Sequence, residues 1–250
     1  MKIIVFFGLM SVSLFLKAVE FPQLPSLREC KPLIDKNLKI NVPPIRNFSS
    51  KVSKKLIVER EFMTIEEFEE TISMLIAMEE KSNNNYDKAV INRNLGYAYV
   101  QAGQMNEALG YFDKALAYGH NNLPHEVLQN LRTNVAALFY SNDNKNKALF
   151  IMEEWMKNSN KDDANAYYLL AAIYADSEID RIKDALCPAY FAIKSLEKPK
   201  ESYYELLLSI HYELEDYVGS ANVLEVMVQT FPQNIKFKKQ LATIYEKIEP

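Results

Sequence analysis

The sequence predicts an all-α protein, built as a solenoid of helical hairpins from about residue 50 to the end of the 250-residue chain. Small and bulky apolar residues return in register along this part, and residues that break helices are rare. The whole chain has only 6 glycines and 10 prolines. Five of the prolines lie before residue 45: Pro22, Pro25, Pro32, Pro43 and Pro44. Since one hairpin cannot bury its apolar face alone, neighbouring hairpins must stack.

The repeat is clearest from Asn94 to Tyr99, where it is followed by Ala108 and Phe112. Equivalent positions recur along the chain at Gly96, Ala136, Ala171, Leu208 and Ala242. They are separated by 40, 35, 37 and 34 residues, close to the ~34 residues of a tetratricopeptide repeat (TPR). The sequence therefore predicts a TPR-type α-solenoid, a right-handed superhelix of about five hairpins plus a C-terminal helix.

The expected helices follow from this register and from local signals. They pair as 50–62 with 64–81, 86–102 with 105–118, 124–141 with 144–158, 163–176 with 179–196, and 201–214 with 217–230, before a lone helix at 235–248. Thr64 and Glu67 have the spacing of a capping box, which predicts a helix start at this point. Gly103 suits a tight turn, because glycine adopts positive φ at little cost.

Packing explains why small residues recur in the first helix of each pair. Gly96, Ala136 and Ala171 each lie one turn before an aromatic residue, so the second helix can approach closely while the ring fills the space beside it. The fifth pair departs from this pattern. There Ser220 replaces the expected alanine, and Gly219 is expected to weaken the start of the second helix.

The first eighteen residues have the features of a secretory signal peptide. A lysine follows Met1, residues 3–16 carry no charge, and Ala18 is a small residue where a peptidase could cut. An uncleaved anchor is the alternative, although 14 residues fall short of the ~20 that span a bilayer. The expected organisation is thus a signal at 1–18, an extended proline-containing arm at 19–49 and a TPR solenoid at 50–250. The expected location is the periplasm, or the inner-membrane surface if the segment stays uncleaved.

Two interpretations are open for the two cysteines, Cys30 and Cys187. After export to an oxidising compartment they could form a disulfide that ties the arm to the solenoid. Alternatively, Cys187 is a small apolar residue in a buried helix and Cys30 is an isolated thiol. Sequence cannot place them within bonding distance, and of the two interpretations we favour the second.

Composition and motifs argue against several classes of function. A net charge of −4 without a basic cluster gives no footprint for nucleic acid. His120, His125 and His211 fall in a loop, at a helix start and in a packing position, so no shared catalytic site is expected. There is no glycine-rich phosphate loop and no cysteine pair at metal spacing. We therefore expect neither an enzyme nor a cofactor or metal, and an enzyme or ligand-binding protein that uses the groove is a remote alternative.

The candidate site is the concave surface, lined by residues of the first helices that lie between the packing positions. Its members are Arg93, Tyr97, Gln101, Asn130, Tyr140, Asn165, Tyr168, Glu205 and Tyr212. Tyrosine recurs, and rigid amphipathic rings suit contacts with another polypeptide. The alternative is that these rings only cover the edge of the core. Because no lysine and asparagine clamp is visible, a ligand bound by its terminal carboxylate is not favoured.

The most specific stretch runs from Lys198 to Leu208 and continues through 212–217 to Phe231 and Pro232. Together with 94–99 and 130–132, it resembles a family of exported bacterial TPR proteins that are often encoded beside TonB, ExbB and ExbD. The resemblance implies a periplasmic scaffold accessory to TonB-dependent outer-membrane transport, with no defined binding residues. The alternative is a scaffold for other envelope assembly, such as outer-membrane protein or cell-wall machinery. Family members usually continue with further repeats, so the end at Pro250 is either natural or a truncation.

Overall fold

A computed structural model describes residues 30–40 and 65–248 of the chain. Within those ranges the regular structure is entirely helical, without a strand. The helices are α2 (Ile65–Glu80), α3 (Asn85–Gln101), α4 (Met105–Gly119), α5 (His125–Ser141), α6 (Lys145–Asn158), α7 (Ala164–Tyr174), the 3-10 helix η3 (Ile182–Ala185), α8 (Leu186–Lys194), α9 (Glu201–Glu213), α10 (Tyr217–Thr230) and α11 (Ile235–Ile248).

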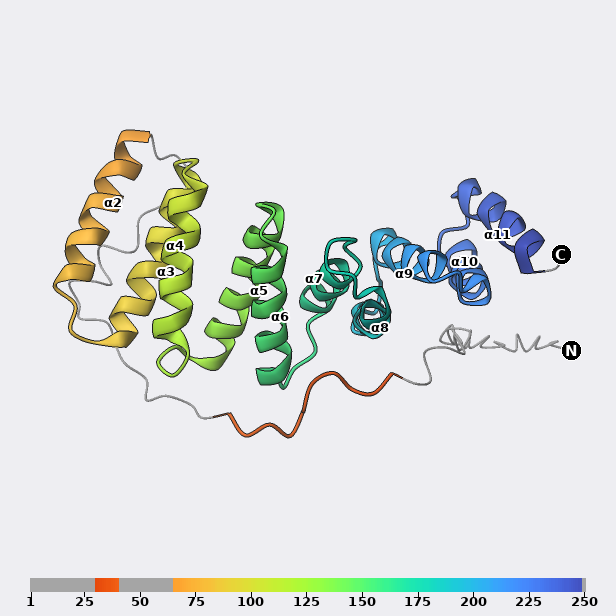
Figure 1. Ribbon diagram of the computed structural model, residues 1–250, viewed down its shortest axis with the longest axis horizontal. Helices are drawn as coiled ribbons and strands as arrows, with labels where there is room; N and C mark the ends of the chain where they lie inside the picture. Colours follow the sequence, from red (N-terminus) through yellow and green to blue (C-terminus); the bar gives the residue numbers. More distant parts are fainter. Residues whose placement is uncertain (1–29, 41–64, 249–250) are drawn as a thin grey trace, which may run out of the picture.

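These helices form antiparallel hairpins that follow one another in a single row, as Figure 1 shows. The hairpins are α3–α4, α5–α6, α7–α8 and α9–α10, with α2 against α3 at one end and α11 against α10 at the other. The expected helix 50–62 and the capping residue Thr64 lie outside the described residues. No helix in the described part of the chain is both long and apolar enough to cross a membrane.

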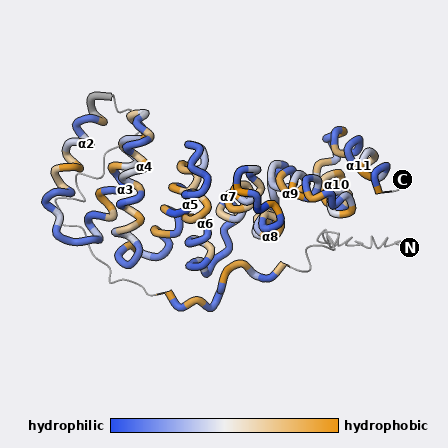
Figure 2. The backbone as a smooth tube through the Cα atoms, viewed as in Figure 1, coloured by the Kyte–Doolittle hydropathy of each residue, from blue (hydrophilic) through white to orange (hydrophobic). Residues whose placement is uncertain are grey.

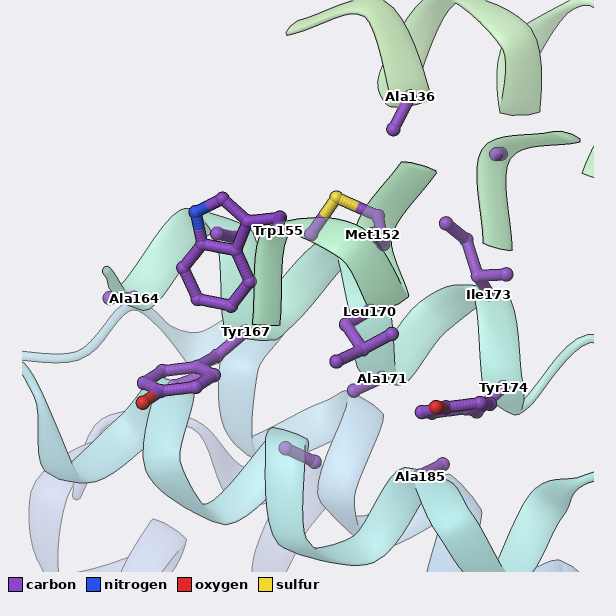
Figure 3. Packing of buried hydrophobic residues seen from close by; sticks show 14 of the residues in the cluster. Ala136, Met152, Trp155, Ala164, Tyr167, Leu170, Ala171, Ile173, Tyr174 and Ala185 are labelled. Carbon is purple, nitrogen blue, oxygen red and sulfur yellow. The ribbon is translucent and has the colours of Figure 1, made fainter. Parts of the chain in front are cut away.

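The core is continuous from one hairpin to the next. Figure 2 shows hydrophobic and hydrophilic residues alternating along the helices, so that each buries one side. Figure 3 shows how Met152 and Trp155 of α6 meet Tyr167 and Leu170 of α7 between two hairpins. The Trp155 ring stands edge-on to Tyr167, with ring centroids 5.4 Å apart. This shared core makes each hairpin depend on its neighbours.

The predicted role of small residues is confirmed in the α3–α4 hairpin. A Cβ placed on Gly96 would lie 2.5 Å from the Phe112 ring of α4, which is far inside van der Waals contact. The two helices then part at Gly103, whose φ of 74° requires the left-handed conformation that glycine tolerates. A side chain at position 96 would push the helices apart.

The prediction of one helix over 179–196 is wrong. The turn after α7 runs to Arg181 and includes Asp180 at a φ of 52°, then a 3-10 turn precedes α8 at Leu186. Pro188 is the third residue of α8, and its ring nitrogen has no hydrogen to donate. Such a residue is tolerated in the first turn, where backbone N–H groups have no partner in the helix, but not further along. An α-helix from residue 179 would place Pro188 in its interior.

The favoured interpretation of the cysteines is also wrong. Cys30 and Cys187 form a disulfide, with Cα atoms 5.5 Å apart, across 157 residues of sequence. Residues 30–40 form a segment without helix or strand that passes alongside α6, α7 and α8 in Figure 1. Within this segment Ile34 is buried in the hydrophobic core. The arm is thus both covalently and hydrophobically attached to the solenoid.

Gly219, which the sequence predicts to weaken the start of α10, has a packing role there and takes part in the cap of the helix. Its N–H donates to Oδ1 of Asp216, the N-cap residue, at 2.8 Å. A Cβ on Gly219 would lie 2.3 Å from Nδ1 of His211, which is fully buried. His211 Nδ1 in turn lies 2.8 Å from Asp216 Oδ2. Glycine is required at position 219 because an imidazole occupies the space of its side chain.

Candidate functional site

The inner surface is formed by the first helices of the hairpins, α3, α5, α7 and α9. Along it α5 touches α7 and α7 touches α9, in addition to the contacts inside each hairpin. Adjacent elements come closest on the inside of a curved stack, so these helices line its concave side. The nine predicted residues all belong to them, but the structure distributes eight of these residues over four separate places and leaves Gln101 outside them.

The first place is a pocket of about 270 Å³ between α3 and α5. Arg93, Tyr97 and Asn130, three of the predicted residues, line it together with Asn94, Val127, Leu131 and Asn134. The amide of Asn134 donates to the Tyr97 hydroxyl at 3.3 Å. The Tyr97 ring rests edge-on against Phe112 at 5.0 Å, which fixes it to the core. The pocket thus combines a guanidinium, several amides and an aromatic wall.

The second place centres on Asp176, at the turn after α7. The Tyr140 hydroxyl of α5 donates to Asp176 Oδ2 at 3.1 Å, and Lys145 Nζ of α6 lies 3.1 Å from Oδ1. Lys145 also pairs with Glu178 at 2.8 Å. Burial acts to raise the pKa of Asp176, but the Glu178 N–H, Lys145 and Tyr140 outweigh it and lower the pKa. Burial and the Asp176 carboxylate raise the pKa of Tyr140.

The third place joins α7 to α9. The ring of Tyr168 lies 4.8 Å from the ring of Tyr203, and the Tyr203 hydroxyl donates to Asn165 Oδ1 at 2.8 Å. Burial raises the pKa of Tyr203, so its hydroxyl stays protonated and can donate this bond at neutral pH. Asn165 itself is exposed, and its side chain accepts this bond through Oδ1.

The fourth place lies between α9 and α11. Lys247 Nζ donates to the Tyr212 hydroxyl at 3.0 Å and lies 4.7 Å from the ring centroids of both Tyr212 and Tyr217. The Tyr212 bond raises the pKa of Lys247. Glu205 lies 3.8 Å from Lys236, a loose surface pair. Gln101 is exposed at the C-terminal end of α3 and belongs to none of the four places.

A common feature of the tyrosines was not expected from the sequence. Tyr97, Tyr140, Tyr203 and Tyr212 each place the hydroxyl against the first helix of a neighbouring repeat or the turn that follows it. They therefore join successive repeats, in line with the alternative that these rings complete the core edge. Sequence reasoning missed Asn134, although it lies one turn after Asn130 on the same helical face. Tyr203 was missed too, because its position is otherwise a packing position.

The three histidines do not share one site, although His120 and His125 both lie near Arg132. His120 Nδ1 lies 3.4 Å from Nη2 of the buried Arg132. Burial, and then the charge of Arg132, lower the pKa of His125. His211 is enclosed between α9 and α10. In the described part of the chain no three His, Cys, Asp or Glu side chains are placed to hold a metal ion.

Comparison with known proteins shows which solved structures have a similar fold. No protein-family model and no curated protein matches the chain. Among solved structures, MamA 41-end from Desulfovibrio magneticus RS-1 is 18% identical over 65% of this chain and 86% of its own, with a TM-score of 0.53. A MamA RS-1 double mutant gives 17% identity, the same coverage and the same TM-score.

A kinesin light chain from Podosopora anserina with nearly identical TPR-like repeats is 15% identical over 80% of this chain and 97% of its own, at a TM-score of 0.48. At such identities a likeness concerns the fold alone. The prediction of an all-α solenoid of the TPR type is confirmed.

Proposed function

We propose that the protein is a scaffold that binds a protein partner along its inner surface. The observation that carries the proposal is the pocket between α3 and α5, where Arg93, Tyr97, Asn130 and Asn134 converge. Amide and guanidinium groups can bind a peptide backbone, and the tyrosine supplies a rigid apolar wall. The tyrosine bonds between repeats support the same role, because a surface held in one shape loses less entropy on binding.

Site-specific photo-crosslinking tests this surface. A photoreactive residue is placed at Asn130 in the pocket, at Tyr212 further along the inner surface, and at Phe150 on α6 as an outer control. All three positions are exposed, and Phe150 is 60% exposed. We expect the same partner to crosslink from Asn130 and Tyr212 and not from Phe150. Equal capture at Phe150, or capture at Phe150 alone, would contradict an inner binding surface.

Matched charge substitutions separate binding from folding. Asn130→Arg fills the pocket, whereas Phe150→Arg alters an exposed position outside it. Asn130→Arg should abolish the crosslink from Tyr212 and Phe150→Arg should leave it unchanged, with both variants as helical as the parent by circular dichroism. Loss of the crosslink in both variants would indicate a general effect on the fold.

The finer proposal is a periplasmic accessory of a TonB-dependent outer-membrane transport system. It is supported by the resemblance carried by 198–232, by the signal-like first eighteen residues and by the Cys30–Cys187 disulfide, since disulfides persist in oxidising compartments. Co-purification of the full chain from envelope extract should recover TonB, ExbB, ExbD or a TonB-dependent receptor. Repeated recovery of outer-membrane assembly or cell-wall proteins instead would favour the alternative scaffold role.

A further inference from the structure

The solenoid surface under the arm is held in part by contacts within the solenoid itself, such as the bond from the Tyr167 hydroxyl to Asp162. Residues 30–40 lie against α6–α8, and the docking strip, as we name it, extends from Asp162 in the loop before α7 to Cys187 in α8. Cys30 and Lys36 are six residues apart, so the strip is at most about 20 Å long. The residues that form the docking strip belong to the solenoid, and residues 30–40 of the arm lie over them.

The arm binds as an extended peptide ligand binds a receptor. Its described residues, 30–40, contain no helix or strand, only a bend at 33–34 and a turn in which the Leu38 N–H donates to the Asp35 carbonyl at 2.9 Å. Ile34 is its one side chain with almost no exposure, at 5%. Lys31, Asp35 and Lys36 are exposed around it. Leu33 packs beside Ile34 against the same core, partly buried. A short apolar anchor with exposed polar residues on both sides is typical of recognition of short peptide segments.

The acidic end of the docking strip is held in place from the core. Asp162 Oδ2 accepts from Lys36 Nζ at 2.6 Å, while Oδ1 accepts from the Tyr167 hydroxyl at 3.0 Å. The Tyr167 ring is buried between Trp155 and Phe191, at centroid distances of 5.4 Å and 5.7 Å. Figure 3 shows the Tyr167 ring under Trp155. The carboxylate would therefore keep its orientation if Lys36 left, ready for another cation.

The disulfide decides whether the docking strip is covered. Without it, the buried Ile34, the partly buried Leu33 and one solvent-exposed ion pair must offset the ordering of eleven arm residues, and such exposed pairs contribute little. With it, the arm is held beside the strip at high effective concentration. Reduction of Cys30–Cys187 by a dithiol, which is itself oxidised to a disulfide, should therefore free the arm to exchange with another peptide on this surface.

We propose that the docking strip is a second peptide-binding site, which the arm covers while the disulfide is intact. Its ligand is an extended segment of a partner protein with a branched apolar residue followed two positions later by lysine or arginine, the pattern of Ile34 and Lys36. The apolar side chain takes the place of Ile34, and the cation pairs with Asp162. This site is separate from the inner surface, so it stands or falls independently of the proposed scaffold function.

The test uses the full chain with its arm displaced. The open variant, Cys30→Ser with Ile34→Asp and Cys187→Ser, removes both attachments of the arm. The probe is a fluorescent peptide of residues 30–40 with serine at position 30, and binding is followed by fluorescence polarisation. We expect saturable binding to the open variant with a dissociation constant at or below about 1 mM, and at least tenfold weaker binding to the oxidised parent.

Matched peptides and a charge swap define the recognition. A probe with Ile34→Asp should lose binding at least tenfold, and one with Lys36→Glu should lose it a few-fold. Asp162→Lys in the open variant should restore the binding of the Lys36→Glu probe, because the two charges are then exchanged. Absence of saturable binding to an open variant that remains helical by circular dichroism would overturn the proposal, as would equal binding to the oxidised parent.

Native mass spectrometry distinguishes a second copy from a separate partner. The variant Cys30→Ser with Cys187→Ser keeps Ile34 and can exchange arms between molecules. We expect it to remain monomeric at micromolar concentration. A dimer that disappears when Ile34→Asp is added would assign the docking strip to the arm of another copy and overturn the proposal of a separate partner.

Discussion

The α3–α4 and α9–α10 hairpins solve the same packing problem in opposite ways. In α3–α4 the glycine lies on the first helix, at Gly96, and the ring comes from the second helix, at Phe112. In α9–α10 the ring comes from the first helix, at His211, and the glycine is on the second, at Gly219. The repeat therefore requires a close approach between its helices, and either helix can supply the small residue.

The exchange brings polar chemistry into the second hairpin. Phe112 needs no hydrogen bond, whereas His211 donates from Nδ1 to Asp216, and its Nε2 is buried without a hydrogen-bond partner among the described residues. Asp216 also caps α10 through the Gly219 N–H. The contact of His211 with Asp216 and Gly219 thus combines core packing, helix capping and a titratable group, whereas the contact of Gly96 with Phe112 is packing alone.

Gly219→Ala should have the largest effect. The new methyl group would displace a buried imidazole and break its bond to Asp216, so we expect a loss of about 2–4 kcal/mol in the free energy of unfolding. Urea unfolding followed by circular dichroism measures it. His211→Ala removes the ring and should reduce the cost of Gly219→Ala in the double variant, leaving only the shift of Asp216 Oδ2, which would lie 2.4 Å from the new methyl group. Additive effects of the two substitutions would show that the glycine does not serve the imidazole.

Gly96→Ala should destabilise less, by about 1–2 kcal/mol. The methyl group meets the Phe112 ring, but alanine also gains about 1 kcal/mol in helix propensity over glycine. The same urea unfolding experiment applies. Because leucine is smaller and more adaptable than phenylalanine, Phe112→Leu should reduce the cost of Gly96→Ala. An equal cost in both backgrounds would refute the close contact.

Of the α3–α4 and α9–α10 hairpins, only α9–α10 should make stability depend on pH near 6. Burial lowers the pKa of His211 below the ordinary 6.5, although Asp216 acts to raise it. The unfolded chain then binds more protons below pH 6.5, so stability is complete above that pH and falls as the pH decreases, by at most about 1.4 kcal/mol per pH unit. Unfolding measured from pH 7.5 to about 5.5 should give a slope that His211→Gln reduces.

The carboxylates and the second shifted histidine do not confuse this measurement. The pKa values of Asp176 and Glu126 are lowered from already acidic values, so the stability they contribute is lost only at lower pH. His125, whose pKa is also lowered, is present in both proteins and cancels in the comparison. An unchanged slope in His211→Gln would mean that His211 does not resist protonation.

Gly110→Ala should have the smallest effect, and of opposite sign. Gly110 is an exposed residue of α4, and a Cβ there would meet no atom within 4 Å. Without a contact to relieve, only helix propensity changes, so we expect a gain of about 0.5–1 kcal/mol. It is the matched control for Gly96→Ala on the same hairpin, and a loss of stability would show that the packing around α4 is tighter than described.

The positions of most helices could be predicted from the sequence, because small residues, aromatic residues and turn residues recur with the period of one repeat. Boundaries agree within about two residues for α3 to α6 and for α9 to α11. The helix expected at 179–196 is an exception, since a proline in a first turn and one in a helix interior look alike in sequence. The candidate site residues lie on the first helices as predicted, but their division into separate places could not be predicted from the sequence.

The sequence by itself determined the order of the hairpins from α3 to α10 and the presence of close helix contacts, because these depend on local period and side-chain size. Only the tertiary structure decided which residues meet: Cys30 with Cys187, His211 with Gly219, and each inner tyrosine with the next repeat. Such pairs join residues that are far apart in sequence or on different helices. Their contact depends on the rotation and stacking of whole hairpins, which no local pattern specifies.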